Sequence, residues 1–196
     1  MSTGSPGRPG TYTPLIDVLF ACTGNICRSP IAEGLLRARL AERAPEVTIG
    51  SVGQLFDGRP AEPEAVAAMA DRGIDISGHL SRRQTAELIT GTSLILGMER
   101  AHVRELSVLV PGTFAHTFTL PEFVRLVEAV PPRSGEDLLS WVEGIGAGRD
   151  TREYLLDEPD DEVADPMGRP LRVFRSSLDG LDDLVSRMVE RVWPES

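Results

Sequence analysis

The sequence predicts an α/β fold with a parallel sheet, and two observations support this. Short apolar runs typical of strands recur along the 196 residues, and most precede a segment in which apolar residues return every three or four positions. No internal repeat interrupts this order, and the length is sufficient for one domain with a full hydrophobic core. We therefore expect strands and helices to alternate within a single domain.

Two strands and two helices are expected in the first half of the chain. Residues 15–21 are almost wholly apolar, as in a strand that is buried on both faces. A helix is expected over 30–43, because Ser29-Pro30 is a typical helix start. A second strand is expected near 47–52, and a second helix over 64–72. The apolar face expected for the first helix consists of Ile31, Leu35, Leu36 and Leu40.

The second half of the chain repeats the pattern. A third strand over 94–96 precedes a helix near 101–110, and a fourth strand over 114–118 precedes a helix at 122–130. The clearest helical periodicity lies at the C-terminal end, where apolar residues recur at three- and four-residue steps. These residues are Phe174, Leu178, Leu181, Val185, Met188 and Val192. Four strands, each followed by a helix, predict a four-stranded parallel sheet.

Two segments depart from this regular order. The periodicity fades over 131–164, where a run rich in proline at 131–135 breaks the chain and only a short helix around 138–142 is expected. We interpret 131–164 as an insertion in a single domain that covers 14–196. Residues 1–13 are rich in Gly, Pro, Ser and Thr and have no apolar centre, so we expect a disordered arm and not a signal peptide.

The composition excludes several classes of function. A formal charge of -10 without a basic run argues against nucleic acid. All 20 cationic side chains are arginine, so neither a Schiff-base lysine nor a Walker-type phosphate loop is available. Two cysteines and three scattered histidines offer neither a disulfide framework nor metal-ligand spacing, and we expect no metal and no cofactor. No apolar segment is long enough to span a membrane. We expect a cytoplasmic monomer.

The run Cys22-Thr23-Gly24-Asn25-Ile26-Cys27-Arg28-Ser29-Pro30 carries the chemistry. It lies between the first expected strand and the helix that opens at Ser29-Pro30. A tight loop at a helix N-terminus points backbone N–H groups inward and adds positive potential, so it suits an anion. The same groups, together with Arg28, would stabilise Cys22 as a thiolate. A nucleophile inside a phosphate cradle indicates phosphoryl transfer through a cysteinyl-phosphate.

The loop resembles the signature of the low-molecular-weight protein tyrosine phosphatases, in which Cys, five residues, Arg and then Ser or Thr occur near the N-terminus of a small α/β domain. Four further landmarks match in the family's order: Ser51-Val52-Gly53, Gly73-Ile74-Asp75-Ile76-Ser77-Gly78-His79, Leu94-Ile95-Leu96-Gly97-Met98 and Asp165-Pro166. The resemblance covers most of the chain outside 131–164. It implies a three-layer, flavodoxin-like sandwich in which helices flank a central four-stranded parallel sheet.

The resemblance also implies residue roles. Cys22 would be the nucleophile, and Arg28 would hold two phosphoryl oxygens in bidentate fashion. Ser29 would donate to the thiolate, and Asp165 would act first as general acid and then as general base. The phosphate-binding residues implied are Thr23, Gly24, Asn25, Ile26, Cys27, Arg28 and Ser29.

A second group of residues would support the loop. Asn25, Ser29, Ser51 and His79 match the family's hydrogen-bonded group that holds the strained loop. Cys27 matches a second loop cysteine that can form a reversible disulfide with the nucleophile, although a packing role is an equal alternative.

The expected pocket departs from the family pattern. Family members usually have aromatic residues after Asp-Pro, where this chain has Met167-Gly168. The other wall would come from Leu55 or Phe56. The missing aromatic residue weakens the expectation of an aryl substrate, but Ile26 supports it. Related arginine phosphatases carry threonine at this position, so Ile26 favours aryl phosphates.

Other residues have less specific interpretations. Three acidic residues compete with Asp165 for the acid role: Asp157, Asp160 and Asp161. His102 and His116 are expected to be structural or surface residues.

The leading functional hypothesis is hydrolysis of phosphotyrosine in proteins, with a phosphorylated partner such as a tyrosine kinase or its target. Protein arginine phosphatase activity is the first alternative. Arsenate reduction with an external thiol is another, because no cysteine follows Cys27 to relay oxidation internally. A phosphoprotein-binding module without catalysis is the third.

Overall fold

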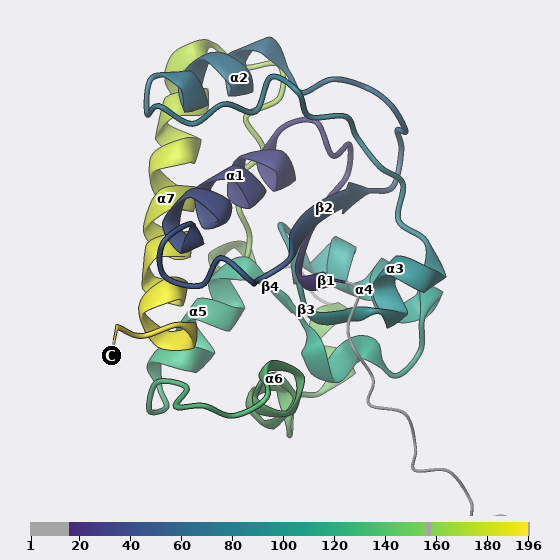
Figure 1. Cartoon of the computed structure of the whole chain (residues 1–196). Coiled ribbons are helices and arrows are strands. Elements are labelled where there is room, and N and C mark those ends of the chain that lie inside the picture. The colour runs from purple at the N-terminus through teal and green to yellow at the C-terminus, as the bar shows by residue number, and fades with distance from the viewer. Residues whose placement is uncertain (1–15, 156–157, 196) are drawn as a thin grey trace, which may run out of the picture.

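The computed structural model describes residues 16–155 and 158–195 (Figure 1). Four parallel strands form a central sheet in the order β2-β1-β3-β4. Their bounds are Ile16–Cys22 for β1, Ile49–Gly53 for β2, Thr92–Gly97 for β3 and Thr117–Thr119 for β4. β1 therefore lies inside the sheet, and the loop after it opens at the carboxyl edge, where ligands bind in open α/β sheets.

Helices cover both faces of the sheet, which confirms the expected three-layer sandwich (Figure 1). One layer holds α1, α2, α5 and α7, and α7 runs along the outside of α1 and α5. The other layer holds α3 and α4. The bounds are Arg28–Leu40 for α1, Pro63–Ala70 for α2, Ala86–Thr90 for α3, Arg100–Leu109 for α4, Leu120–Glu128 for α5 and Leu171–Val192 for α7.

The apolar run of β1 separates the core into two parts. Val18 and Phe20 face the layer that contains α1 and α7, whereas Leu19 and Ala21 face the opposite layer. All four are at most 1% exposed. A strand buried on both faces needs a continuous apolar sequence, and this explains the apolar run 18–21.

Several expected boundaries differ from the structure, and one helix was not expected. The strand expected at 114–118 is wrong over 114–116, because a 3-10 helix, η1 (Thr113–His116), occupies these residues. A carbonyl of η1 accepts a side-chain hydrogen bond instead of one from a neighbouring strand. The Thr117 hydroxyl donates to the Thr113 carbonyl over 2.8 Å. The helix α1 begins two residues earlier than expected, and α3 is a short helix that the sequence analysis missed. Leu15, the first residue of the expected first strand, lies outside the described residues, as do residues 1–13.

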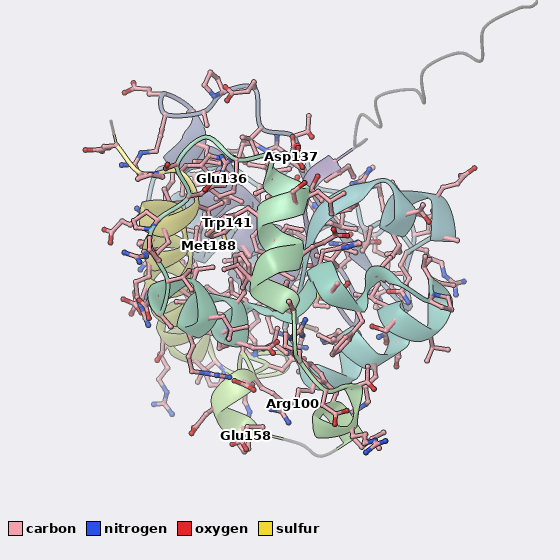
Figure 2. All side chains as sticks on the ribbon, turned by 90° about the horizontal axis from the view of Figure 1, so that it is seen from below. Arg100, Glu136, Asp137, Trp141, Glu158 and Met188 are labelled. Atoms are coloured by element: carbon pink, nitrogen blue, oxygen red, sulfur yellow. The ribbon has the colours of Figure 1, made fainter. Side chains whose placement is uncertain are left out.

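The segment 131–164 has more structure than its sequence predicts. It contains α6 (Leu138–Gly146) and two 3-10 helices, η2 (Thr151–Leu155) and η3 (Pro159–Asp161). α6 packs on η1 and β3. It lies at the lower end of the molecule in Figure 1 and faces the viewer in Figure 2, which is the view from below. A Cβ on Gly146 would lie 1.9 Å from the Ala115 carbonyl oxygen, so only glycine permits this contact.

Arg149 fastens the same segment to the edge of the sheet. Its guanidinium is 8% exposed and pairs with Glu122 of α5 over 2.9 Å. It also donates to the carbonyls of Phe114 and Thr117, each over 2.9 Å. Tyr154 of η2 completes the cluster through its hydroxyl, which contacts Arg149 and Glu122. None of the helices in the two described ranges is long and apolar enough to cross a membrane.

We predict that Arg149→Met destabilises the protein by about 3–5 kcal/mol, because the buried Glu122 carboxylate loses its cation. The control is Arg187→Met on α7. Its guanidinium is 41% exposed and pairs with Glu128, so the loss should stay below about 1 kcal/mol. Urea unfolding monitored by circular dichroism measures both values. Equal losses in the two variants would show that the Arg149 cluster does not hold the segment.

Candidate active site

The loop between β1 and α1 surrounds a buried sulfur atom. Cys22 is the last residue of β1 and is 4% exposed. The Asn25 N–H points to its Sγ over 3.3 Å, and the Ser29 hydroxyl lies 3.1 Å from the same atom. Ser29 belongs to the first turn of α1, whose dipole adds positive potential at the loop. The sulfur therefore lies within hydrogen-bond distance of a backbone N–H and a hydroxyl, at the N-terminal end of a helix.

Asn25 holds the loop in an unusual conformation. Its φ of 53° is left-handed, and among the described residues other than glycine it alone has a positive φ. Its side-chain amide donates to Ser51 over 2.8 Å and to Ser29 over 2.9 Å. Its side-chain oxygen accepts from the Arg82 N–H over 2.8 Å, and its carbonyl lies 2.7 Å from Nε2 of His79. The structure thus brings together the support residues expected from the sequence and adds Arg82.

Two further residues complete this support. The Ser51 hydroxyl donates to Glu33 of α1 over 2.6 Å. Gly53 lies against the loop so closely that an added Cβ would be 2.7 Å from the Asn25 nitrogen. Glu33 was missed in the sequence analysis, because nothing local marks a helix carboxylate as a partner of a strand serine.

Arg28 joins the loop to distant parts of the chain. Its side chain is 2% exposed and donates to Asp165 over 2.9 Å and to the Val163 carbonyl over 3.0 Å. It also forms an ion pair with Glu99, which follows β3. Asp165 in turn accepts from the Met167 N–H over 3.0 Å, which fixes a turn after the carboxylate. Asp165 therefore lies next to the predicted anion site. Glu99 is a further partner of Arg28 that the sequence analysis did not predict.

The competing acidic residues lie elsewhere. Asp160 is exposed on η3. The Asp161 carboxylate is buried and pairs with two arginines, Arg100 and Arg125. Asp157 lies outside the described residues.

A pocket of about 180 Å³ opens above the loop. Its lining residues are Cys22, Thr23, Gly24, Ile26, Cys27, Arg28, Leu55, Phe56, Asp165 and Met167. Leu55 and Met167 are 57% and 41% exposed, so they form the open rim. The Arg59 guanidinium lies 4.2 Å from the centre of the Phe56 ring and makes a cation–π contact there. All three expected wall residues thus line the pocket, and Phe56 is its aromatic surface.

His102 and Cys27, at the loop, are buried and uncharged, and so is His116 in η1. Nε2 of His102 lies 3.0 Å from the Thr23 hydroxyl, and burial lowers the pKa of this histidine to about 4. Burial and the neighbouring Cys22 raise the pKa of the Cys27 thiol. His116 is buried within η1, and burial lowers its pKa as well. Of the two alternatives expected for His102 and His116, structural or surface residues, the buried positions favour the structural one.

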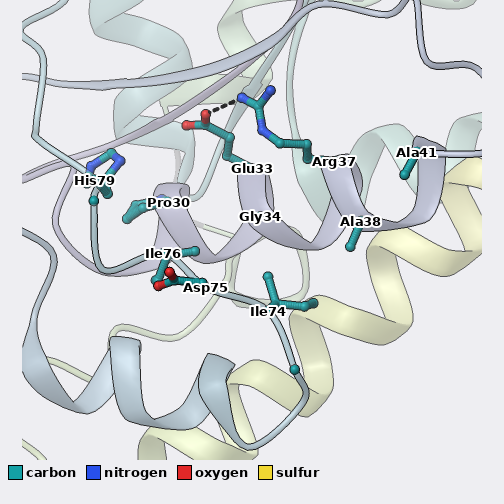
Figure 3. A pocket seen from close by; sticks show the side chains of 12 residues that line it. Pro30, Glu33, Gly34, Arg37, Ala38, Ala41, Ile74, Asp75, Ile76 and His79 are labelled. Atoms are coloured by element: carbon teal, nitrogen blue, oxygen red, sulfur yellow. Dashed lines mark hydrogen bonds and ion pairs between the residues drawn. The ribbon is translucent and has the colours of Figure 1, made fainter.

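A larger hollow of about 470 Å³ lies on the other side of α1, between this helix and residues 73–79 (Figure 3). Figure 3 shows Glu33 paired with Arg37 on α1, with His79 at the end of the hollow nearer Pro30. Neither Cys22 nor Arg28 lines it. The candidate catalytic residues therefore line the smaller pocket and not this hollow.

Comparisons with known proteins show which proteins this chain is similar to. The family model of the low molecular weight phosphotyrosine protein phosphatases matches residues 17–130. The low molecular weight protein-tyrosine-phosphatase Etp of Escherichia coli K12 is 35% identical over 130 residues, which are 65% of this chain and 85% of that protein. A protein-arginine-phosphatase of Geobacillus stearothermophilus is 29% identical over 179 residues, which are 91% of this chain and 97% of that protein.

The fold is also similar to solved structures. The crystal structure of a low molecular weight protein tyrosine phosphatase from T. tengcongensis aligns with a TM-score of 0.67 and 30% identity. The alignment covers 90% of this chain and 99% of that one. Because the family model matches more than half of the sequence and includes the whole loop, this chain belongs to the low molecular weight phosphotyrosine protein phosphatase family.

Proposed function

We propose that this protein hydrolyses phosphotyrosine in proteins, in two steps and through a cysteinyl-phosphate. The observation that carries the proposal is the convergence of Cys22, Arg28 and Asp165 on one pocket of about 180 Å³. A nucleophile, a cation for the phosphoryl oxygens and a proton donor are the three groups that this reaction needs.

In the first step the Cys22 thiolate attacks phosphorus, and the bond from phosphorus to the phenolic oxygen breaks. Arg28 and the loop N–H groups hold the phosphoryl oxygens as charge develops on them. In the structure the Arg28 guanidinium lies 2.9 Å from the Asp165 carboxylate. A phosphoryl group that binds to Arg28 therefore competes with this carboxylate. Asp165, protonated in this step, then gives its proton to the leaving phenolate.

In the second step the Asp165 carboxylate accepts a proton from water, and the water oxygen attacks phosphorus. The sulfur–phosphorus bond breaks, inorganic phosphate forms and the thiolate returns. Ser29, whose hydroxyl lies 3.1 Å from Sγ, is placed to donate a hydrogen bond to the departing sulfur. Its own oxygen accepts from Asn25, which orients the hydroxyl.

The pocket walls support an aryl substrate. Ile26 is 5% exposed and lines the pocket, so an apolar side chain occupies the place where related arginine phosphatases carry threonine. Phe56 offers one face for stacking on a ring. The natural substrate is then a phosphorylated protein, such as a tyrosine kinase or its target, and we infer a cytoplasmic monomer.

Phosphoarginine is the second candidate substrate. The protein-arginine-phosphatase relative matches 91% of this chain, including the region after residue 130 that the family model does not reach. The rim formed by Leu55 and Met167 is also open, so a flexible side chain can enter. Arsenate reduction with an external thiol uses the same nucleophile and is tested by a thiol-dependent arsenate assay.

Cys22→Ser should abolish hydrolysis of phosphotyrosine peptides and of p-nitrophenyl phosphate, because the alcohol is not ionised at neutral pH. Phosphate release from the purified variant is the measurement. Ser140→Ala on the distant helix α6 serves as the control and should keep the wild-type rate. Residual activity near the wild-type level in Cys22→Ser would remove the basis of the mechanism.

Asp165→Asn should lower kcat/KM for phenyl phosphate by about 10²–10⁴-fold, the usual contribution of a positioned acid. The loss should be much smaller for p-nitrophenyl phosphate, whose leaving group departs without a proton. Steady-state rates for the two substrates give the comparison. Equal losses for both would mean that Asp165 does not protonate the leaving oxygen.

Ile26→Thr should shift the preference toward phosphoarginine, because a smaller, polar side chain replaces part of the apolar wall. We expect the ratio of phosphotyrosine to phosphoarginine kcat/KM to fall about tenfold, and Ile26→Val to change it little. A wild-type enzyme that already prefers phosphoarginine would contradict the proposed substrate while leaving the nucleophile's role intact.

A further inference from the structure

Asp161 is a buried carboxylate that the reaction itself does not use. One oxygen lies 2.7 Å from the Arg100 guanidinium, and the other lies 2.8 Å from that of Arg125. Burial opposes its charge, but hydrogen bonds from both arginines outweigh this and hold the pKa of the carboxyl below its ordinary value. Asp161 is therefore an anion with a partner on each oxygen.

The two arginines come from different parts of the fold. Arg100 is the first residue of α4, which follows β3, and Arg125 belongs to α5, which follows β4. Figure 2 places Arg100 beside Glu158, the residue before η3. Asp161 thus ties the end of η3 to two helices at once, and breaking one contact leaves the other.

The chain after Asp161 leads directly to the proposed acid. The Val163 N–H donates to the Met98 carbonyl over 2.8 Å, and the Val163 carbonyl accepts from Arg28 over 3.0 Å. The Ala164 carbonyl accepts from the Ser177 hydroxyl of α7 over 3.3 Å. These backbone contacts hold the segment, but they are single neutral acceptors and donors apart from Arg28. Among the described residues just before the acid, the Asp161 carboxylate makes two ion pairs with arginine, and the Glu162 carboxylate accepts from the Arg100 N–H over 3.4 Å.

We propose that Asp161 is a positioning residue for Asp165. It fastens the segment 161–165 so that the Asp165 carboxyl stands within reach of the leaving oxygen when a phosphoryl group occupies Arg28. This inference rests on the proposed function. General acid catalysis needs heavy atoms within about 2.6–3.2 Å, so a small displacement of the loop weakens it strongly.

The test is the ratio of kcat/KM for phenyl phosphate to kcat/KM for p-nitrophenyl phosphate. Only the first substrate needs a proton for its leaving group, and the ratio does not depend on how much of a sample is folded. Asp161→Asn should lower the ratio about tenfold, a part of what a positioned acid contributes. Arg125→Gln should lower it about threefold, because Arg100 still holds the carboxylate. The Arg125 side chain is 61% exposed, so this variant keeps the test valid if Asp161→Asn folds poorly.

The same substitution in the Asp165→Asn background separates positioning from a general structural role. If Asp161 acts through Asp165, adding Asp161→Asn to Asp165→Asn should leave the ratio unchanged within about twofold. If the ratio in the double variant falls below that of Asp165→Asn by the same factor as in the wild-type background, the proposal is overturned. It is also overturned if Asp161→Asn and Arg125→Gln both keep the wild-type ratio.

Asp183→Asn is the matched control, because it removes one carboxylate and its 3.1 Å contact with Arg187 on the exposed side of α7. Its ratio should equal that of the wild type. The same data distinguish a failure of the proposed function from a failure of the Asp161 proposal. If the wild-type protein hydrolyses neither substrate in a Cys22-dependent way, the proposed function is refuted. Activity on both substrates with an unaltered ratio in the variants would refute only the role of Asp161.

Discussion

The left-handed turn at Asn25 is the constraint on which the rest of the site depends. A φ of 53° is unfavourable for most residues and persists only where the surroundings fix it. Here four groups do so: the hydroxyls of Ser29 and Ser51, the Arg82 N–H and the His79 ring. The turn directs the Asn25 N–H at the Cys22 sulfur, so the strained backbone becomes part of the anion site.

Arg28 extends this local order across the molecule. It is almost fully buried and makes contacts with Glu99, Val163 and Asp165, which come from two other regions of the chain. A buried guanidinium requires hydrogen-bonding partners, and one of these partners, Asp165, is the proposed general acid. The buried cation therefore holds the loop of Asp165 beside the loop of Cys22.

Much of the fold could be predicted from the sequence, because the information is local. A strand buried on both faces must be apolar along its buried part, as 18–21 is, and α7 must show its apolar face every three or four residues. The loop was also predictable, since its cysteine, glycine and arginine spacing lies within one short run. By contrast, η1 replaces part of an expected strand because its carbonyls bond to Thr117 and Arg149, and Arg149 lies more than thirty residues away.

The partners of the site residues were harder to predict for the same reason. In the sequence Glu33 looks like an ordinary helix-surface carboxylate and Glu99 like a loop residue after a strand. Only the packing of α1 and β3 against the loop brings them to Ser51 and Arg28. Asp161 lies in an acidic run that is typical of a solvated loop. Its burial depends on two arginines from α4 and α5, and no local pattern connects the three.

The open rim of the pocket makes the anchoring of the acid loop matter more in this chain. Phe56 is the aromatic residue among those that line the pocket, and Met167 opposite is flexible and 41% exposed. A ring held between two aromatic walls would present its leaving oxygen in a fixed place. With one wall, the phosphoryl group is oriented mainly by Arg28 and the loop, and the ring retains more freedom. The proposed acid, Asp165, must then be held in place by the protein and not by the substrate. The contacts of Val163, Ala164 and Asp161 provide this restraint, and so the segment that precedes the acid loop contributes to the geometry of proton transfer.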